Sequence, residues 1–299
     1  MLLGGEIKMA FTLKIKKRDS LDNMHISFGE LLENCNLSFG HDNDFYILED
    51  GMVERTAILY NPSRIGRGIF FDGRNIDEGI IEISYNIPTT ESEIEDFINV
   101  ARELERQMES VDMYCIEEER NYTLEELMDN KERMVLFSQI KLNEFCANKE
   151  YESYIFTLAM WPLVLTDEMV EKFEKCTDLQ EFEQILHDKQ NMDVYYAKPR
   201  LLQKQNGEIG AFYVFTEECE SIFPVKADGF INLNQTKVDE GFVQYYIFSE
   251  DYMMDGLYSY DKFISYMLEH GATYYDKNHI LVPSMNKAQM EELAKATLA

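Results

Sequence analysis

Four arginines lie close together in the first third of the chain, at Arg55, Arg64, Arg67 and Arg74, and Ser63 stands beside them. The planar guanidinium fork of arginine fits carboxylate and phosphate groups, and neighbouring glycines let a ligand approach backbone amides. The stretch 61–74 is therefore a candidate loop for a small anionic ligand, with four ligand-binding residues: Ser63, Arg64, Arg67 and Arg74. The alternative is that these arginines pair with carboxylates of the same chain, which carries 56 acidic and 28 basic residues.

Signatures of other chemistries are weak or missing. His41-Asp42-Asn43-Asp44 gathers potential metal ligands, but a calcium loop needs a longer alternation that ends in glutamate, so a polar turn is the better interpretation. Gly66-x-Gly68 has no third glycine at dinucleotide spacing, and the phosphate-loop, serine-hydrolase and zinc-protease motifs do not occur. The sequence therefore assigns no catalytic residue, no metal and no cofactor, and favours a protein that is not an enzyme.

The charge of the chain restricts its partners. The formal net charge is −28, which repels nucleic-acid phosphates and anionic lipid surfaces. Residues 76–134 form the acidic centre, and a long negative helix face can steer a basic protein into contact. We therefore expect a protein partner, in particular a basic one, and neither nucleic acid nor a membrane.

Hydrophobic patterning and cysteine usage point to the cytoplasm. The longest apolar run, 154–165, is shorter than the ~18 residues of a membrane helix and is interrupted by Trp161-Pro162. Five cysteines are scattered without a Cys-x-x-Cys pair, which is typical of reduced thiols. Residues 1–8 do not resemble a signal peptide. We interpret them as translated leader or disordered sequence ahead of a native start at Met9.

Tyrosines gather in the last third of the chain, where 11 of the 18 lie between Tyr195 and Tyr275. Tyrosine and methionine are enriched at protein interfaces, so we predict an interface that includes four residues: Tyr245, Tyr246, Tyr258 and Tyr260. The alternative is that these tyrosines line the margin of a core with their hydroxyl groups in water.

The elements that must position these residues follow from periodicity and capping signals. Strands are predicted at 11–16, 45–48, 57–60, 68–71, 80–85, 113–116 and 154–160, and the Asn206-Gly207 turn predicts a hairpin. Helices are predicted to begin after Ser27, Thr90, Thr123, Thr166, Asp178, Ser259 or Asp261, and near Asn286. The helix that begins after Thr123 is expected to continue unbroken through Phe145.

Strands and helices come in blocks and do not alternate strictly, which favours an α+β fold of mostly antiparallel sheets with amphipathic helices packed on them. The length suits two sub-domains, and we place them at 9–165 and 166–299.

Three short motifs carry a resemblance: Asn61-Pro62-Ser63-Arg64-Ile65-Gly66-Arg67-Gly68-Ile69, Glu82-Ile83-Ser84-Tyr85, and Pro88-Thr89-Thr90 before an acidic amphipathic helix. With the length and the order of elements, they resemble a bacterial family catalogued as domain of unknown function 4299. The resemblance covers nearly the whole chain. It implies a bacterial cytoplasmic protein and transfers no catalytic residue.

Two functions from different classes follow. The first is a non-enzymatic protein-binding module, of a regulatory or immunity type, that uses acidic helix faces and the tyrosine-rich surface. The second is a protein or enzyme that binds a small anionic ligand through the arginine-rich loop 61–74.

Overall fold

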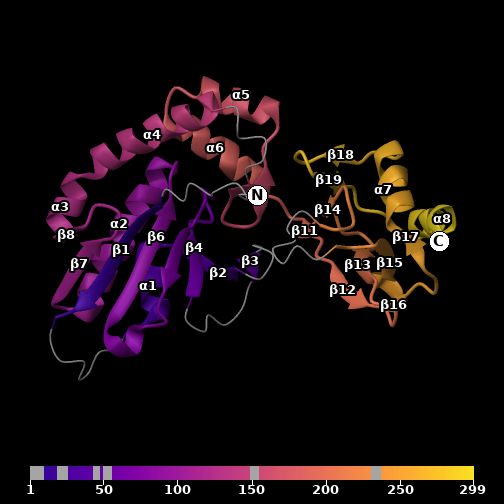
Figure 1. Ribbon diagram of the computed structural model, residues 1–299, viewed down its shortest axis with the longest axis horizontal. Coiled ribbons are helices and arrows are strands. Elements are labelled where there is room, and N and C mark those ends of the chain that lie inside the picture. The colour runs from indigo at the N-terminus through magenta and orange to yellow at the C-terminus, as the bar shows by residue number, and fades with distance from the viewer. Residues whose placement is uncertain (1–9, 19–25, 43–47, 50–55, 149–154, 230–236) are drawn as a thin grey trace. The chain divides into compact units, whose positions relative to one another are not determined.

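The computed structural model describes residues 10–18, 26–42, 48–49, 56–148, 155–229 and 237–299 (Figure 1). The predicted leader 1–8, most of the predicted strand 45–48 and Arg55 lie outside these ranges. By its internal contacts the chain divides into two compact units, Met1–Asn191 and Met192–Ala299, and each is described by itself.

Within the described residues, the first unit is built on an eight-stranded sheet in which neighbouring strands run antiparallel. Its strands, in spatial order, are β3 (Leu48–Glu49), β2 (Ser38–Asp42), β4 (Thr56–Tyr60), β5 (Ile69–Asp72), β6 (Ile80–Asn86), β1 (Ala10–Lys17), β7 (Val111–Cys115) and β8 (Arg120–Tyr122). The predicted strands 11–16, 57–60, 68–71, 80–85 and 113–116 are confirmed, whereas the predicted strand 154–160 ends at Thr157.

One face of this sheet is buried, as the alternation in β1 predicts. Leu13 is fully buried and pairs with Ile83 of β6 and Cys115 of β7, which are also fully buried. The next residue, Lys14, points to the other face, where it pairs with Glu82. Apolar side chains therefore gather on a single face, and the helices of this unit must cover it.

Helix α2 (Glu91–Met108) covers that face and contacts β1 and β6, with α1 (Phe28–Cys35) beside it. The Thr90 side chain accepts a hydrogen bond from the Glu93 amide and so caps the helix. Six predicted apolar positions of α2 are all buried: Ile94, Phe97, Ile98, Ala101, Leu104 and Met108. The prediction for this helix is confirmed.

The helix predicted from Thr123 through Phe145 is interrupted, which corrects the sequence prediction. The chain forms α3 (Leu124–Asp129) and α4 (Lys131–Ala147), with Asn130 between them. The Asn130 backbone and side chain both donate to the Glu126 carbonyl, at 3.1 and 2.6 Å. An asparagine side chain that competes for backbone groups disfavours a continuous helix, which explains the break.

The first unit ends with the short hairpin β9 (Ile155–Thr157) and β10 (Pro162–Val164), followed by α5 (Asp167–Lys175) and α6 (Leu179–Gln190). Phe156 of β9 packs against Phe173 of α5 and Phe182 of α6, with ring centroids 6.0 and 6.1 Å apart. These contacts join α5 and α6 to the first unit. The division between units therefore follows α6, later in the chain than the boundary that we placed at 165/166 from the sequence.

The second unit has two sheets. The five-stranded sheet holds β12 (Arg200–Gln203), β13 (Ile209–Thr216), β15 (Glu240–Ile247), β16 (Tyr252–Met253) and β17 (Tyr258–Ser259). The other holds β11 (Tyr195–Tyr196), β14 (Ser221–Pro224), β19 (His279–Val282) and β18 (Thr273–Tyr274). The predicted Asn206-Gly207 hairpin is confirmed between β12 and β13, where Gly207 has a φ of 90°.

Helices α7 (Tyr260–Glu269) and α8 (Lys287–Thr297) pack with both sheets around an aromatic core. Ser259 and Asn286 cap them, as predicted. Antiparallel pairs dominate, and β11–β14 and β13–β15 are parallel. The protein therefore has the α+β fold that the sequence predicted.

Candidate functional site

The candidate loop joins β4 to β5, and its first turn is closed by its own side chains. Ser63 donates to the Asn61 side chain through its amide at 3.1 Å and through its hydroxyl at 2.7 Å. The Arg64 amide donates to the Asn61 carbonyl at 3.1 Å. This is the local hydrogen bonding by which asparagine favours turns. The Ser63 hydroxyl therefore stabilises the turn, from which Arg64 extends toward α2.

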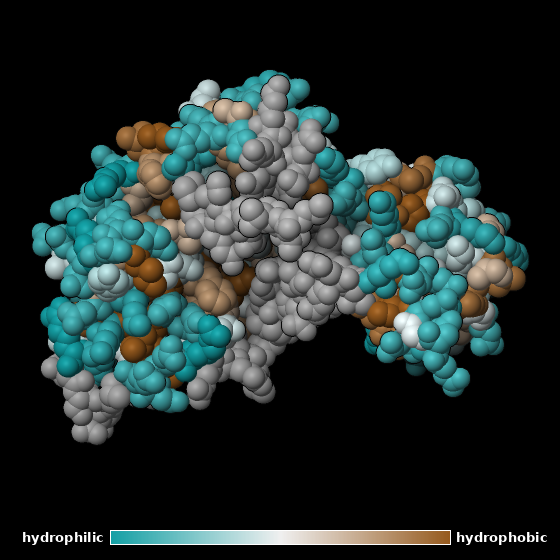
Figure 2. Space-filling view, viewed as in Figure 1, coloured by the Kyte–Doolittle hydropathy of each residue, from teal (hydrophilic) through white to brown (hydrophobic). Residues whose placement is uncertain are grey.

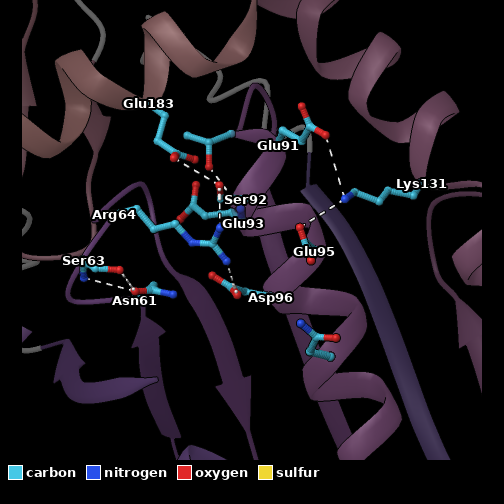
Figure 3. A network of polar contacts seen from close by, with 12 residues as sticks. Asn61, Ser63, Arg64, Glu91, Ser92, Glu93, Glu95, Asp96, Lys131 and Glu183 are labelled. Atoms are coloured by element: carbon cyan, nitrogen blue, oxygen red, sulfur yellow. Dashed lines mark hydrogen bonds and ion pairs between the residues drawn. The ribbon is translucent and has the colours of Figure 1, made fainter. Parts of the chain in front are cut away.

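Arg64 is occupied by residues of the α2 N-terminus (Figure 3). Its guanidinium donates to the Ser92 hydroxyl at 3.1 Å and to the Asp96 carboxylate at 3.0 Å. The Asp96 side chain is 4% exposed and that of Arg64 is 34% exposed. The Ser92 hydroxyl in turn donates to Glu183 of α6 at 3.1 Å. Arg64 is thus part of a polar network, and its Nε is buried with no hydrogen-bond partner among the described residues.

The pKa of Asp96 is raised to about 6. Burial is the main cause, because it disfavours the charged carboxylate, and the nearby Glu93 adds to it. The charge and hydrogen bond of Arg64 act in the opposite direction. The Arg64–Asp96 pair is therefore a partly desolvated ion pair whose acid titrates near neutral pH.

The raised pKa makes folding stability depend on pH. The unfolded-state pKa is about 3.9, so the stability that Asp96 contributes is fully present below it and is lost as the pH rises through about 6. Asp96→Asn removes this titration. Relative to the wild type, we expect the variant to gain up to about 3 kcal/mol between about pH 4 and pH 7.5, as urea unfolding measures. Parallel pH profiles of the two proteins would contradict the assignment.

Arg67 lies deeper than Arg64. It donates to the carbonyl oxygens of Thr157 and Pro88, each at 3.0 Å, and its guanidinium lies 4.1 Å from the ring centroid of Phe156. Burial lowers the pKa of Arg67 to about 10, while the negative charge of Glu93 opposes the shift. Arg67 stays protonated at neutral pH, and it holds together three segments of the first unit.

The Glu93 carboxylate closes the other side of the loop. It accepts hydrogen bonds from the Thr89 hydroxyl at 2.6 Å and from the Gly68 amide. A Cβ atom on Gly66 would lie 2.5 Å from this carboxylate, so a larger residue there would force the Glu93 side chain to move. Gly66 therefore makes room for a carboxylate of the chain itself.

Helix α6 completes the site with two residues that sequence reasoning did not assign. His187 Nδ1 accepts a hydrogen bond from the Ile65 amide at 3.0 Å. The Gln190 amide donates to the Gly66 carbonyl at 2.8 Å and accepts from the Met160 amide at 3.0 Å. A signal was present, because Glu183, His187 and Gln190 recur every three to four residues and so share a helix face. A polar stripe beside an apolar one indicates a helix that docks on polar groups.

The fourth candidate residue, Arg74, is not part of this network. It makes a two-pronged ion pair with Asp72, and its side chain is 66% exposed. The structure therefore brings Ser63, Arg64 and Arg67 together and leaves Arg74 apart. The predicted group of arginines is not one ligand site.

The predicted tyrosine interface is wrong for three of its four residues. Tyr245, Tyr258 and Tyr260 are 0%, 3% and 0% exposed and belong to the core of the second unit. Tyr246 is partly exposed, and its hydroxyl donates to Asp251. Strand alternation explains the split, because neighbouring residues of β15 point to opposite faces.

A second buried polar cluster lies in the second unit. The Tyr196 hydroxyl is 2.7 Å from His279 Nε2, and His279 Nδ1 is 2.9 Å from the Asp276 carboxylate. Burial raises the pKa of Tyr196 well above its usual value. The hydroxyl therefore stays protonated, and Tyr196, His279 and Asp276 form a hydrogen-bonded chain. An unactivated, enclosed tyrosine indicates that this cluster supports the fold.

Exposed apolar side chains gather on α4 (Figures 1 and 2). Leu136, Phe137 and Ile140 are 61%, 44% and 44% exposed, and their spacing places them on one helix face. We call these three residues the α4 ridge. The opposite face is buried through Met134 and Leu142. Helix α4 is therefore apolar on two faces, and only one of them serves the core.

A family model matches residues 9–293, almost the entire chain, and its description is Domain of unknown function (DUF4299). The chain belongs to the DUF4299 family. The resemblance predicted from the three short motifs is thereby confirmed. No curated protein and no solved structure matches the chain.

Two further findings concern the DUF4299 chain in its described ranges. No group of three or more His, Cys, Asp or Glu side chains there could hold a metal ion. No helix in the same ranges is long and apolar enough to cross a membrane. The guanidinium of Arg64 is held by the Ser92 hydroxyl and the Asp96 carboxylate, so an external anion at these donors would have to displace Asp96.

Proposed function

We propose that this DUF4299 protein is a non-enzymatic binding module, of a regulatory or immunity type, which docks a basic protein partner on the α4 ridge. The observation that carries the proposal is the exposed trio Leu136, Phe137 and Ile140 on a helix whose other face is already buried. Contiguous exposed apolar side chains with a polar rim are typical of protein interaction sites.

The net charge of the chain supports a basic partner, while the rim of the ridge carries both signs. Glu132 stands one turn before Leu136 and Glu144 one turn after Ile140. Arg133 stands one turn before Phe137, and Lys141 lies 5.4 Å from the Phe137 ring centroid and pairs with Glu144. The nearby α3 adds Met128 to the exposed apolar side chains, together with further exposed acids. With a formal net charge of −28, the chain attracts a cationic surface over a long range. A partner with apolar residues inside a basic rim fits this face.

The alternative use of loop 61–74 for an anionic ligand has less support. Arg64 and Arg67 are engaged by Asp96, Ser92 and two carbonyl oxygens, and Arg74 pairs with Asp72.

We place the protein in the bacterial cytoplasm. All five cysteines are free thiols, which suits that reducing compartment.

A photo-crosslinking residue at Phe137 tests the proposal. In the native host, we expect position 137 to capture a basic protein that the same residue at Glu174, an exposed position on α5, does not capture. With that protein purified, Leu136→Asp should raise Kd at least about ten-fold, because it puts a charge into an apolar contact. Rising salt should weaken the wild-type complex.

Two results would reject the α4 ridge as the docking face. One is capture of the same proteins from positions 137 and 174. The other is an unchanged Kd for Leu136→Asp. A complex that tightens in salt would reject the basic partner while leaving the ridge in place.

A further inference from the structure

Strand β12 forms an edge of the five-stranded sheet in the second unit, because its one strand neighbour in the described part of the chain is β13. All four of its residues are exposed, and two of them are leucines: Leu201 is 40% exposed and Leu202 is 55% exposed. Sheet edges in soluble proteins are usually guarded by charges, bulges or coverage. An exposed leucine pair at the centre of an edge strand is therefore unusual.

The hydrogen-bond register shows which backbone groups of β12 face outward. The Lys204 amide donates to the Glu208 carbonyl across the turn. Because hydrogen-bonded pairs alternate along an antiparallel ladder, Lys204–Glu208 and Leu202–Gly210 are hydrogen-bonded pairs. Gln203 lies between these two pairs and opposite Ile209, whose carbonyl accepts a hydrogen bond from the Asp239 amide on the side of β15. The amide and carbonyl groups of Leu201 and Gln203 consequently point away from β13. They present two donor and acceptor pairs to an incoming strand.

The side chains of β12 define what such a strand must carry. Leu202 pairs with Gly210 and so shares a face with Phe212, which stacks on Phe242 with centroids 5.1 Å apart. Leu201 lies on the opposite face of the sheet. A strand added beside β12 would cover both leucines, and it therefore needs apolar side chains on both of its faces at the centre.

The charge around β12 is opposite to that of the chain. Residues 194–207 contain three bases, Lys198, Arg200 and Lys204, and no acid. The side chain of Arg200 makes no ion pair within the described ranges. Lys204 does have partners, in Glu208 and Glu240. The Arg200 flank of the edge strand thus favours an acidic group, whereas the charge of Lys204 is already matched within the chain.

A second copy of this chain fits the edge poorly. A two-fold axis through Leu202 would pair Leu201 with Gln203 of the copy and satisfy the outward groups. The same axis places Arg200 opposite Lys204 of the copy, and like charges directly opposite destabilise a sheet. This local repulsion favours a different occupant, one that brings an acidic group to Arg200.

We propose that β12 is a strand-addition site for an extended segment of a partner protein, with apolar residues at its centre and Asp or Glu at the end that lies beside Arg200. Backbone hydrogen bonds to Leu201 and Gln203 hold the segment, the two leucines select apolar side chains, and Arg200 selects an acidic end. This is the recognition mode in which a peptide adds a strand to a sheet edge. The site is separate from the α4 ridge, and it would bind an acidic segment, whereas the ridge is proposed to bind a basic protein.

The test uses the full chain and a phage-displayed library of random decapeptides. Peptides are selected on the wild type and counter-selected on Gln203→Pro. Proline removes an outward amide but no hydrogen bond to β13, and edge strands accept it. Gln203→Ala is the matched control, since it keeps the amide. We expect the selected peptides to be rich in Val, Ile, Asp and Glu and to lose affinity at least ten-fold on Gln203→Pro but not on Gln203→Ala.

Thermal unfolding first establishes that both variants fold as the wild type does. If Gln203→Pro does not fold, Leu201→N-methyl-leucine in a semisynthetic chain removes the other outward amide and keeps the side chain. On the bound wild type, the amides of Leu201 and Gln203 should gain protection from hydrogen exchange. The proposal is overturned if no peptide distinguishes Gln203→Pro from the wild type, if the selected peptides are basic, or if those two amides gain no protection. None of these outcomes bears on the α4 ridge, because the selection compares proteins that share it.

Discussion

We expect Arg67→Met to lower the free energy of unfolding of the first unit by about 3 to 5 kcal/mol. Methionine has a similar length, so the change removes charge and donors more than volume. The carbonyl oxygens of Thr157 and Pro88 would lose their donor, and Glu93 would lose a nearby positive charge in a buried setting. Urea unfolding, followed by circular dichroism, measures the loss.

Arg74→Met is the matched control for this variant. It makes the same substitution at the other end of the predicted arginine group, where the side chain is exposed and pairs with Asp72. We expect no measurable change in stability, as is usual for surface pairs. Arg67→Lys keeps the positive charge but loses the planar guanidinium fork, so its free energy of unfolding should lie between those of Arg67→Met and Arg74→Met. Equal stability of Arg67→Met and Arg74→Met would show that Arg67 is not a structural residue.

The second large effect is expected in the other unit. Tyr260→Ala should destabilise it by about 3 to 5 kcal/mol, the usual range for removing a buried aromatic ring. The Tyr260 ring packs against Tyr213, with centroids 4.6 Å apart, and its hydroxyl donates to the Pro224 carbonyl. Hydrogen exchange of the β13 and β15 amides would report the loss within this unit.

Tyr246→Ala is the control for Tyr260→Ala, because it removes a partly exposed tyrosine of the same predicted group. We expect its exchange pattern in β13 to match that of the wild type. Tyr260→Phe should cost about 1 to 2 kcal/mol, since it leaves the Pro224 carbonyl without this donor. If Tyr260→Ala instead left stability intact and abolished partner binding, the original interface interpretation would be restored.

Local signals predicted the secondary structure well where a cap and a periodic apolar face coincided. Helix α2 begins after Thr90 and buries the predicted positions, and α8 begins after Asn286 with a full capping box. The helix across Asn130 was predicted wrongly, because hydrophobic spacing alone does not register a side chain that competes for backbone hydrogen bonds. The end of the first unit was likewise set by aromatic packing among Phe156, Phe173 and Phe182.

The arginine group shows which structural properties cannot be inferred from the sequence alone. Residue types and spacing determined that Ser63, Arg64 and Arg67 share one tight loop after a strand, and that the chain belongs to a recognisable family. Only the tertiary structure decided what the guanidinium groups face. Asp96, which faces Arg64, and Thr157, whose carbonyl faces Arg67, come from segments 30 or more residues away, and the pairing of residues at such separations leaves no local pattern.

The exposure of the tyrosines and of the edge strand was also decided by tertiary contacts. Period-two alternation could predict that Tyr245 and Tyr246 point to opposite faces, but not which face α7 and α8 would cover. Nor could Leu201 and Leu202 be placed at a sheet edge before β13 was known to pair with β15 on its other side. Sequence determined the elements, the class and the charge. Burial and strand order, which depend on contacts between distant segments, decided which of its residues remain available to a partner.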